Sequence, residues 1–252
     1  ISGRLRIGIP GRLRRNPQQG CPKAWRKEIF INDAPTIEQD YSSLHIALLY
    51  ARKGINYYEA YEGDAYQLAT PSFLSTAEQT RKYGKLLLLM AINAKTAKDA
   101  YAAFRSNRKD RKDSLGGSLT NEQLAVLLEG LQAKHPVIAD GLGSDAGIEL
   151  MNEDGKITEY VIQKFTERDK PVLTIHDSYI THFGDADLLQ EVLEEAYYKV
   201  TGLYGVKSEL TGVAIDDEDS WQTQRLPDEA MLRSDGYRAR MLEWMIHTND
   251  NT

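Results

Sequence analysis

Hydrophobic residues recur at the spacing of one helix face in several segments of this chain, which predicts a structure rich in helices. Helices are expected in six segments: 42–52, 64–73 (a short helix that Pro71 ends), 76–104, 120–134, 144–168 and 185–202. The segment 76–104 contains no proline and is expected to form one long helix or two. Gly202 is expected to end the helix that precedes it, and a short helix is expected near 227–245.

Two segments have the sequence character of β-hairpins. The first, 27–40, alternates between apolar and polar residues and is expected to turn at Asn32–Pro35. The second, 171–183, has two apolar runs separated by the polar pair His176–Asp177, so we expect a hairpin with a polar tip.

Composition excludes several classes of protein. Hydrophobic residues make up 41% and charged residues 27% of the 252 residues, which is typical of a globular chain and not of a disordered one. The longest apolar run, Leu86–Ile92, is too short to span a membrane. Cys21 is the single cysteine, which excludes a disulfide framework and a cysteine-based zinc site. Because the sequence starts at Ile1 without a signal-peptide pattern, we expect a portion of a longer protein.

Charge is unevenly distributed around a net value of −6. Residues 1–28 carry eight Lys and Arg against one acid, and residues 105–112 carry five against one. Residues 209–252 carry ten acids against four Arg. Basic stretches can neutralise phosphates, and solvated surface charge is the alternative interpretation. The charged, glycine-containing stretch 105–118 is expected to be a loop, and the chain after Val206 is expected to be irregular.

Two aspartates stand where predicted strands end. Asp40 follows a predicted strand and precedes a predicted helix, and Asp177 lies at the tip of the second hairpin. A carboxylate within apolar strand sequence is costly unless it is paired or bound to a metal. Two such carboxylates suit a pair of Mg²⁺ ions, which prefer oxygen ligands and can activate a 3′-hydroxyl and stabilise a leaving pyrophosphate. The alternative for Asp40 is a simple helix cap.

A basic pair lies on one face of the long predicted helix. Arg81 and Lys85 are four residues apart, and Leu89 and Asn93 continue the same face. Arg and Lys one turn apart can hold a triphosphate. An amphipathic helix with ordinary basic surface residues is the alternative.

Taken in order, these segments resemble the palm and fingers of single-subunit polymerases, which include family A DNA polymerases and phage and mitochondrial RNA polymerases. The stretch DYSSLHIALLYA from Asp40 resembles motif A of family A, and RKYGKLLLLMAINA from Arg81 resembles motif B. The stretch LTIHDSYIT around Asp177 resembles motif C, where His-Asp precedes Ser in RNA polymerases and Glu in DNA polymerases. The stretch GRLR near the start resembles the Gly-Arg motif that touches the template–product duplex. The resemblance covers roughly residues 3–200.

The resemblance implies the residues that carry the chemistry. Asp40, Asp177 and the backbone carbonyl of Tyr41 would ligate two catalytic Mg²⁺ ions. Arg81 and Lys85 would hold the phosphates of the incoming nucleotide, and Lys85 would protonate the pyrophosphate. These groups supply the positioning and the charge stabilisation that phosphoryl transfer needs.

Other positions match the family pattern only in part. By resemblance, His176 would lie near the primer 3′ end and Arg4 would contact the nucleic-acid backbone. Asn93 stands where motif B has Tyr, and Leu89 replaces the usual aromatic residue or Met. His45 stands where family A DNA polymerases have a Glu that blocks ribonucleotides. His45 and Asn93 are therefore candidate nucleotide-binding residues, and an ordinary polar helix residue is the alternative for His45.

The resemblance implies an α+β fold. We expect a right-hand palm whose antiparallel sheet of about four to six strands carries the two Asp, with compact helical fingers. Residues 1–75 would form the palm run-in with motif A, and 76–170 the fingers with motif B. Residues 171–252 would hold the motif C hairpin, the following helix and an acidic tail. The expected enzyme is a template-directed nucleotidyltransferase, a DNA-directed RNA polymerase of the phage type because of His-Asp-Ser.

Two alternatives stay open. A family A-like DNA polymerase or primase is one, because motif A resembles family A. The other is one subunit of a split polymerase, whose second subunit supplies the thumb or N-terminal elements that 252 residues do not accommodate. The implied partners are template and product strands and nucleoside triphosphates, with no membrane. The resemblance also implies a cytoplasmic protein of a phage or mobile element in a bacterial host.

Overall fold

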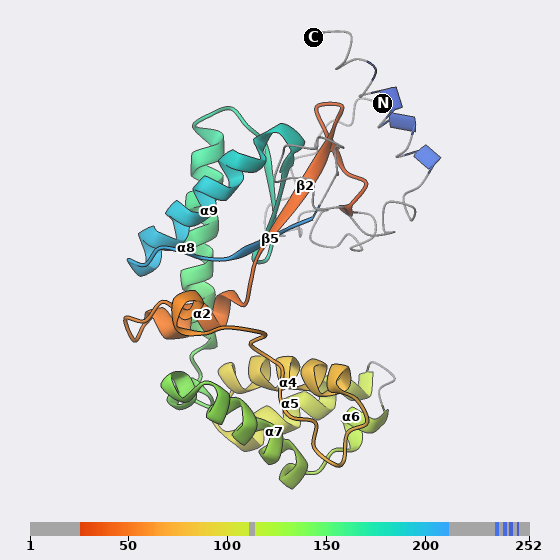
Figure 1. Cartoon of the computed structure of the whole chain (residues 1–252), viewed down its shortest axis with the longest axis vertical. Coiled ribbons are helices and arrows are strands. Elements are labelled where there is room, and N and C mark those ends of the chain that lie inside the picture. Colours follow the sequence, from red (N-terminus) through yellow and green to blue (C-terminus); the bar gives the residue numbers. More distant parts are fainter. Residues whose placement is uncertain are drawn as a thin grey trace, which may run out of the picture. The chain divides into compact units, whose positions relative to one another are not determined.

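The computed structural model describes residues 26–110 and 114–211, and helical pieces at 235–236, 239–240, 242–243 and 246. These residues form helices and a five-stranded antiparallel sheet (Figure 1). The chain divides into two compact units. The sheet unit comprises the described parts of 1–42, 160–193 and 208–252, and the helical unit comprises those of 43–159 and 194–207.

The sheet is built around its longest strand, β2 (Ala34–Tyr41). The other strands are β1 (Phe30–Ile31), β3 (Val172–Ile175), β4 (Ser178–His182) and β5 (Ser208–Thr211). The strand order is β1-β2-β4-β3, with β5 also paired to β2. Near its C-terminal end β2 is therefore paired on both edges, with Asp40 opposite Ser178 of β4 and Glu209 of β5.

Both predicted hairpins are confirmed. Strands β1 and β2 are joined by Asn32 and Asp33, whose φ angles of 52° and 59° match the left-handed turns that suit a twisted hairpin. Asn and Asp tolerate this conformation because their short polar side chains fit it. The turn is shorter than expected, since Ala34 and Pro35 already belong to β2. Strands β3 and β4 are joined by the predicted pair His176–Asp177.

The helical unit contains α2 (Leu44–Ala51), α3 (Tyr57–Ala60), α4 (Ala77–Ile92), α5 (Ala97–Asp110), α6 (Ser114–Ser118), α7 (Asn121–Lys134) and the 3-10 helix η2 (Pro136–Gly141). Helices α8 (Gly147–Thr166) and α9 (Ala186–Thr201) contribute residues to both units, and the 3-10 helix η3 (Phe183–Asp185) precedes α9. Among the residues that the structure describes, no helix is both long and apolar enough to cross a membrane.

The helix ends follow local sequence rules. Thr76 caps α4 by accepting the backbone N–H of Gln79 at 3.1 Å, and Thr120 forms a capping box with Gln123 at the start of α7. Gly202 ends α9 as expected, with a φ of 74° and its N–H bonded to a carbonyl of the last turn. The stretch 76–104 forms two helices, α4 and α5, and α5 continues beyond it.

Three expectations were wrong. Residues 64–73 form no helix, because the Asp64 side chain accepts two backbone N–H groups in a local turn and Pro71 disfavours helix just before it. The stretch 105–118 was expected to be a loop, but α5 runs to Asp110, since long charged side chains favour helix, and Ser114–Ser118 form α6. Strand β5 lies in the region after Val206 that was expected to be irregular; four residues carry too short an alternation to be recognised.

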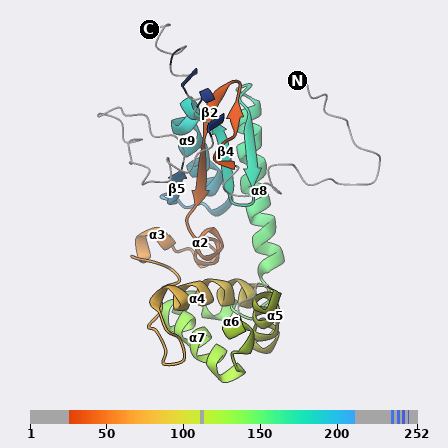
Figure 2. The ribbon, with the colours of Figure 1, turned by 90° about the vertical axis from the view of Figure 1, so that its right-hand side faces the viewer.

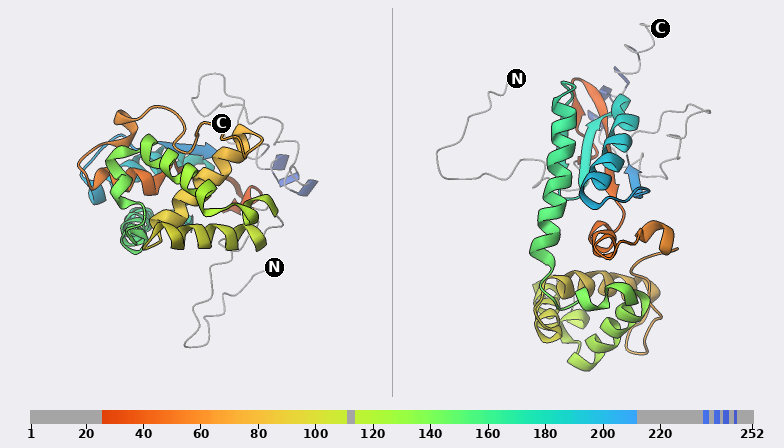
Figure 3. Two further views of the ribbon diagram at one scale, coloured as in Figure 1. Left: turned by 90° about the horizontal axis from the view of Figure 1, so that it is seen from below. Right: turned by 90° about the vertical axis from the view of Figure 1, so that its left-hand side faces the viewer.

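One face of the sheet packs against α9 (Figure 3). The buried Tyr41 ring lies edge-on to Tyr179 at 6.1 Å, and its hydroxyl donates to the carbonyl of Leu193 at 2.6 Å. Gln39, on the same face, bonds the side chains of Gln190 and Ser208. Because side chains alternate along a strand, Asp40 points to the opposite face.

The helical unit has its own core. Figure 2 shows α4, α5, α6 and α7 gathered into one group of helices. The fully buried rings of Tyr83 and Phe104 pack edge to face, with centroids 5.6 Å apart, beside the buried leucines of α7. This core fixes the rotation of α4, so that Arg81 and Lys85 lie away from the buried side of the helix.

Candidate active site

The two candidate metal ligands lie at the same end of the sheet. Asp40 is the last residue but one of β2, and Asp177 is the residue directly before β4. The backbone N–H of Tyr41 donates to the carbonyl of Asp177 at 3.2 Å, so the two segments are joined directly. Asp40 is exposed and Asp177 is half-buried. Antiparallel pairing thus brings the backbone segments of two aspartates that are far apart in the sequence to one end of the sheet.

The turn that carries Asp177 is tight. His176 has a φ of 55° and an exposed side chain, and it is the first of the two turn residues. His is one of the residue types that enter this left-handed region more readily than most. The turn therefore places the His176 side chain beside the end of the sheet that carries the two aspartates.

A third carboxylate lies near Asp40 on the same face of β2. Glu38 is two residues earlier, so its side chain shares the face of Asp40. Its Oε1 accepts a hydrogen bond from the Ser178 hydroxyl at 2.5 Å and forms an ion pair with Arg26 at 3.2 Å. Only 12% of the Glu38 side chain is exposed, so its carboxylate depends on these two partners for compensation of its charge. The bond to Glu38 also fixes the side chain of Ser178, the residue after Asp177.

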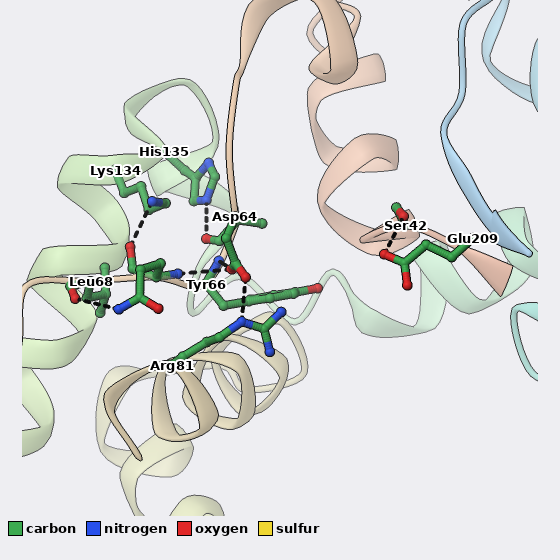
Figure 4. A network of polar contacts seen from close by, with 10 residues as sticks. Ser42, Asp64, Tyr66, Leu68, Arg81, Lys134, His135 and Glu209 are labelled. Carbon is green, nitrogen blue, oxygen red and sulfur yellow. Dashed lines mark hydrogen bonds and ion pairs between the residues drawn. The ribbon is translucent and has the colours of Figure 1, made fainter. Parts of the chain in front are cut away.

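A fourth carboxylate enters from β5. Glu209 stands directly opposite Asp40 in the ladder and accepts a hydrogen bond from the Ser42 hydroxyl at 3.1 Å (Figure 4). The sequence interpretation missed Glu209 because it missed β5. Glu38 was also missed, although its place two residues before Asp40 in a predicted strand already put both on one face.

The end of the sheet that carries Asp40 and Asp177 offers several oxygen atoms. Among the described residues, no group of three or more His, Cys, Asp or Glu is placed to hold a metal ion. Asp40 and Asp177 supply two carboxylates, and the Tyr41 carbonyl is a third oxygen. Magnesium is commonly held by one or two carboxylates while substrate phosphates complete its coordination. These oxygen donors are of the type that Mg²⁺ prefers.

Arg81 of α4 lies against a loop of its own unit (Figure 4), and Lys85 lies one turn further along the same helix. The Nε–H of Arg81 donates to Oδ2 of Asp64. The Tyr66 ring lies beside both cations, 5.7 Å from the Arg81 guanidinium carbon and 5.1 Å from the Lys85 amino nitrogen. The cation–aromatic contacts and the ion pair give both long side chains a defined position on the face of α4.

The segment 64–68, here the 64–68 loop, is anchored at several points. Lys134 donates to the carbonyl of Gln67 at 2.7 Å, and His135 donates to the carbonyl of Ala65 at 2.9 Å. Gly84 of α4 lies so close that an added Cβ would stand 3.1 Å from the Tyr66 carbonyl oxygen. Glycine at this position lets the loop cross α4 directly beside Arg81 and Lys85.

The Asp64 carboxylate is strongly tied to its surroundings. Burial raises its pKa, but the hydrogen bond from Arg81, the N–H groups of Tyr66 and Gln67 and the Arg81 charge together hold the pKa of Asp64 below its ordinary value. Asp64 is therefore ionised near neutral pH. With 43% of its side chain exposed, Arg81 is accessible to a further anion.

His135 anchors the loop from the buried side. Its side chain is fully buried, and because a carbonyl only accepts, Nε2 carries the proton that bonds Ala65. Nδ1 then accepts from the Tyr50 hydroxyl at 3.1 Å. Burial chiefly, and the Lys134 charge in addition, hold the pKa of His135 below 6.5 despite the Ala65 carbonyl. His135 is accordingly neutral near pH 7 in the folded protein.

We expect stability to fall as the pH is lowered through the range near 6.5. A histidine whose pKa is lowered by folding binds its proton more tightly when unfolded, so the stability present above pH 6.5 is lost below it. Urea denaturation between about pH 7.5 and 5.5, above the range where ordinary carboxylates titrate, measures this slope. The variant His135→Gln should show a shallower slope, and an equal slope would contradict the assignment.

The remaining predicted site residues lie in several places. His45 is half-buried in the first turn of α2. Asn93 ends α4, and its side-chain N–H donates to the Leu89 carbonyl at 2.8 Å. An added Cβ at Gly147 would collide with the Asn93 side chain, so Asn93 is packed as a helix end. Arg4 lies outside the described residues.

The sequence matches no family model and no curated protein. Among solved structures, the chain is similar to the POL domain of Pol1 from M. smegmatis, determined in complex with a DNA primer-template and dNTP. The TM-score is 0.44 and the identity 11%, with 73% of this chain and 41% of that chain covered. This chain thus spans less than half the length of that structure, and the similarity is a distant likeness of fold.

Proposed function

We propose that the protein catalyses template-directed nucleotidyl transfer. A 3′-hydroxyl oxygen attacks the α-phosphorus of a nucleoside triphosphate, the bond to the β-phosphate oxygen breaks, and pyrophosphate leaves. The observation that carries the proposal is the pairing of β2 with β4, in which the N–H of Tyr41 bonds the Asp177 carbonyl. This pairing supports a joint role for Asp40 and Asp177.

In this proposal the end of the sheet is the metal site. Asp40, Asp177 and the Tyr41 carbonyl would hold two Mg²⁺ ions. When bound, Mg²⁺ activates the attacking hydroxyl and stabilises the charge of the leaving pyrophosphate. The Tyr41 side chain is buried against Leu193 and Tyr179, so this residue can contribute through its backbone alone.

In the same proposal Arg81 and Lys85 of α4 would bind the phosphates of the nucleotide. Arg81 can bind a phosphate through two parallel N–H groups, and Lys85 adds a point charge one turn further along α4. Lys85 also donates a proton to the leaving pyrophosphate. The shared support of both cations by Tyr66, at 5.7 and 5.1 Å, favours a common ligand for the pair.

The proposed enzyme is an RNA polymerase of the phage type, because Ser178 follows His176–Asp177 in motif C. A family A-like DNA polymerase is the second candidate, favoured by the sequence that begins at Asp40. In that case the half-buried His45 in the first turn of α2 takes the role of the residue that selects the sugar.

Nucleotide incorporation on a primed single-stranded DNA template tests the proposal. Ribonucleotides and deoxyribonucleotides are supplied in parallel with Mg²⁺, and a chelator or the variant Asp177→Ala serves as the blank. Extension with ribonucleotides that both blanks remove supports the RNA polymerase proposal. Extension with deoxyribonucleotides and not with ribonucleotides supports the DNA polymerase candidate instead. Absence of extension with either nucleotide, while the protein is folded, overturns the proposed activity of the isolated chain.

A further inference from the structure

Asp64 contacts Arg81 on one edge of the guanidinium group. The contact uses Nε of Arg81, and Figure 4 shows Asp64 on this side of the side chain. Among the residues that the structure describes, none accepts a hydrogen bond from the two terminal nitrogens of Arg81. An Arg held through Nε keeps its terminal N–H groups for a second anion.

Asp64 is itself held rigidly by the backbone. Its Oδ1 accepts the N–H of Tyr66 at 2.7 Å and the N–H of Gln67 at 3.1 Å, while Oδ2 accepts from Arg81. Oδ1 of Asp64 thus accepts hydrogen bonds within the 64–68 loop, and Oδ2 accepts one from α4. Since Lys134 and His135 fix the same loop, the Asp64 carboxylate is a fixed point against which Arg81 is oriented.

We propose that Asp64 is a positioning residue that orients Arg81 for binding a polyphosphate, an inference that rests on the proposed nucleotide-binding role of Arg81. Ordering a long side chain on binding costs affinity, and a side chain that is already ordered avoids this cost. The Tyr66 ring beside Arg81 and Lys85 acts in the same direction. The ligand class is a linear polyphosphate, as in a nucleoside triphosphate.

Two physical effects of Asp64 have opposite signs, which makes the proposal testable. Its negative charge by itself repels an anion that approaches Arg81, so removing the charge should strengthen binding. Its hold on Nε orients the guanidinium group, so removing the hold should weaken binding. Positioning is the dominant effect if a neutral residue at this position weakens the affinity for an anion.

The variant Asp64→Asn removes the ion pair with Arg81 and keeps the hydrogen bonds within the 64–68 loop. Asn keeps an oxygen for the N–H groups of Tyr66 and Gln67, but it presents an N–H where Oδ2 accepted from Arg81. Calorimetric titration with inorganic tripolyphosphate compares this variant with the wild type, and thermal unfolding checks that the fold is retained. We expect about three- to tenfold weaker binding at an unchanged unfolding temperature, the cost of ordering one long side chain.

The matched control is Asp140→Asn. Asp140 is also an exposed carboxylate of the helical unit, paired with Lys53 at 2.7 Å, and it does not contact Arg81. Its removal changes the net charge equally, so it should leave tripolyphosphate binding unchanged or slightly stronger. Arg81→Ala should weaken binding at least as much as Asp64→Asn.

Each outcome decides between the two proposals. Unchanged or tighter binding by Asp64→Asn overturns the positioning role and makes Asp64 a competitor of the ligand. A wild-type protein that does not bind tripolyphosphate overturns both the positioning role and the nucleotide site. The wild-type protein could bind tripolyphosphate in a way that depends on Asp64 and yet extend no primer. This result supports the positioning role and contradicts the proposed polymerase activity.

Discussion

Replacing Asp40 or Asp177 by Asn is expected to lower nucleotide incorporation by about a thousandfold or more, since a metal that stabilises transition-state charge contributes several kcal/mol. Asn keeps the size of the side chain and removes the negative charge that a Mg²⁺ ligand needs. Asp40 is exposed and Asp177 lies in a turn, so neither change should disturb the core. Single-turnover primer extension at saturating nucleotide measures the effect.

The double variant gives a sharper result than either single one. Because Asp40 and Asp177 would hold the metals as a unit, the double variant should be little slower than the single variants. Independent electrostatic roles would instead multiply the two losses. Asp33→Asn is the control, since Asp33 is an exposed turn residue before the other end of β2. Incorporation that survives in both single variants would rule out the proposed metal site.

Replacing His135 by Leu is expected to lower the free energy of unfolding by about 3 kcal/mol, because each buried polar group left without a partner costs about 1–3 kcal/mol. The two groups are the Tyr50 hydroxyl and the Ala65 carbonyl, which His135 bonds at 3.1 and 2.9 Å. Leu has a similar volume, so the loss comes chiefly from hydrogen bonds and not from a cavity. Urea denaturation at pH 7.5 measures the change.

Two conservative variants separate the bonds of His135. Gln can place an N–H near the position of Nε2 and keep the bond to Ala65, whereas Asn can place an oxygen near Nδ1 and keep the bond to Tyr50. Each should cost less stability than Leu. The Asn variant should also weaken tripolyphosphate binding, since it releases the 64–68 loop beside Arg81. A His135→Leu variant as stable as the wild type would show that neither hydrogen bond of His135 contributes to the stability of the fold.

Much of the secondary structure could be predicted because its causes are local. The apolar spacing of α7 and α9, the Thr76 cap and the Gly202 stop each act within a few residues. The two hairpins were predictable for the same reason, since alternation and turn residues lie next to each other. The prediction of a helix at 64–73 was wrong because Asp64 forms a local turn with the backbone. The prediction of a loop at 105–118 was wrong in part because the charged residues up to Asp110 favour helix.

The sequence named candidate site residues, and the structure shows where they lie. Motif order named Asp40, Asp177, Arg81 and Lys85 and implied that the two aspartates act together. Nothing in the sequence gives the register of β2 against β4 or the pairing of β2 with β5, because strands far apart in the chain pair only when the whole sheet forms. The approach of Glu209 to Asp40 therefore could not be anticipated.

The sequence by itself determined the residue types, many of the helix and turn positions and the spacing of Arg81 and Lys85 along one helix face. Tertiary structure alone decided which segments meet: the Tyr41 N–H with the Asp177 carbonyl, and the Asp64 carboxylate with Arg81. The physical reason is that helices and turns are stabilised by contacts within a few residues. Sheet pairing and loop anchoring depend on groups that the folded chain brings together from distant positions.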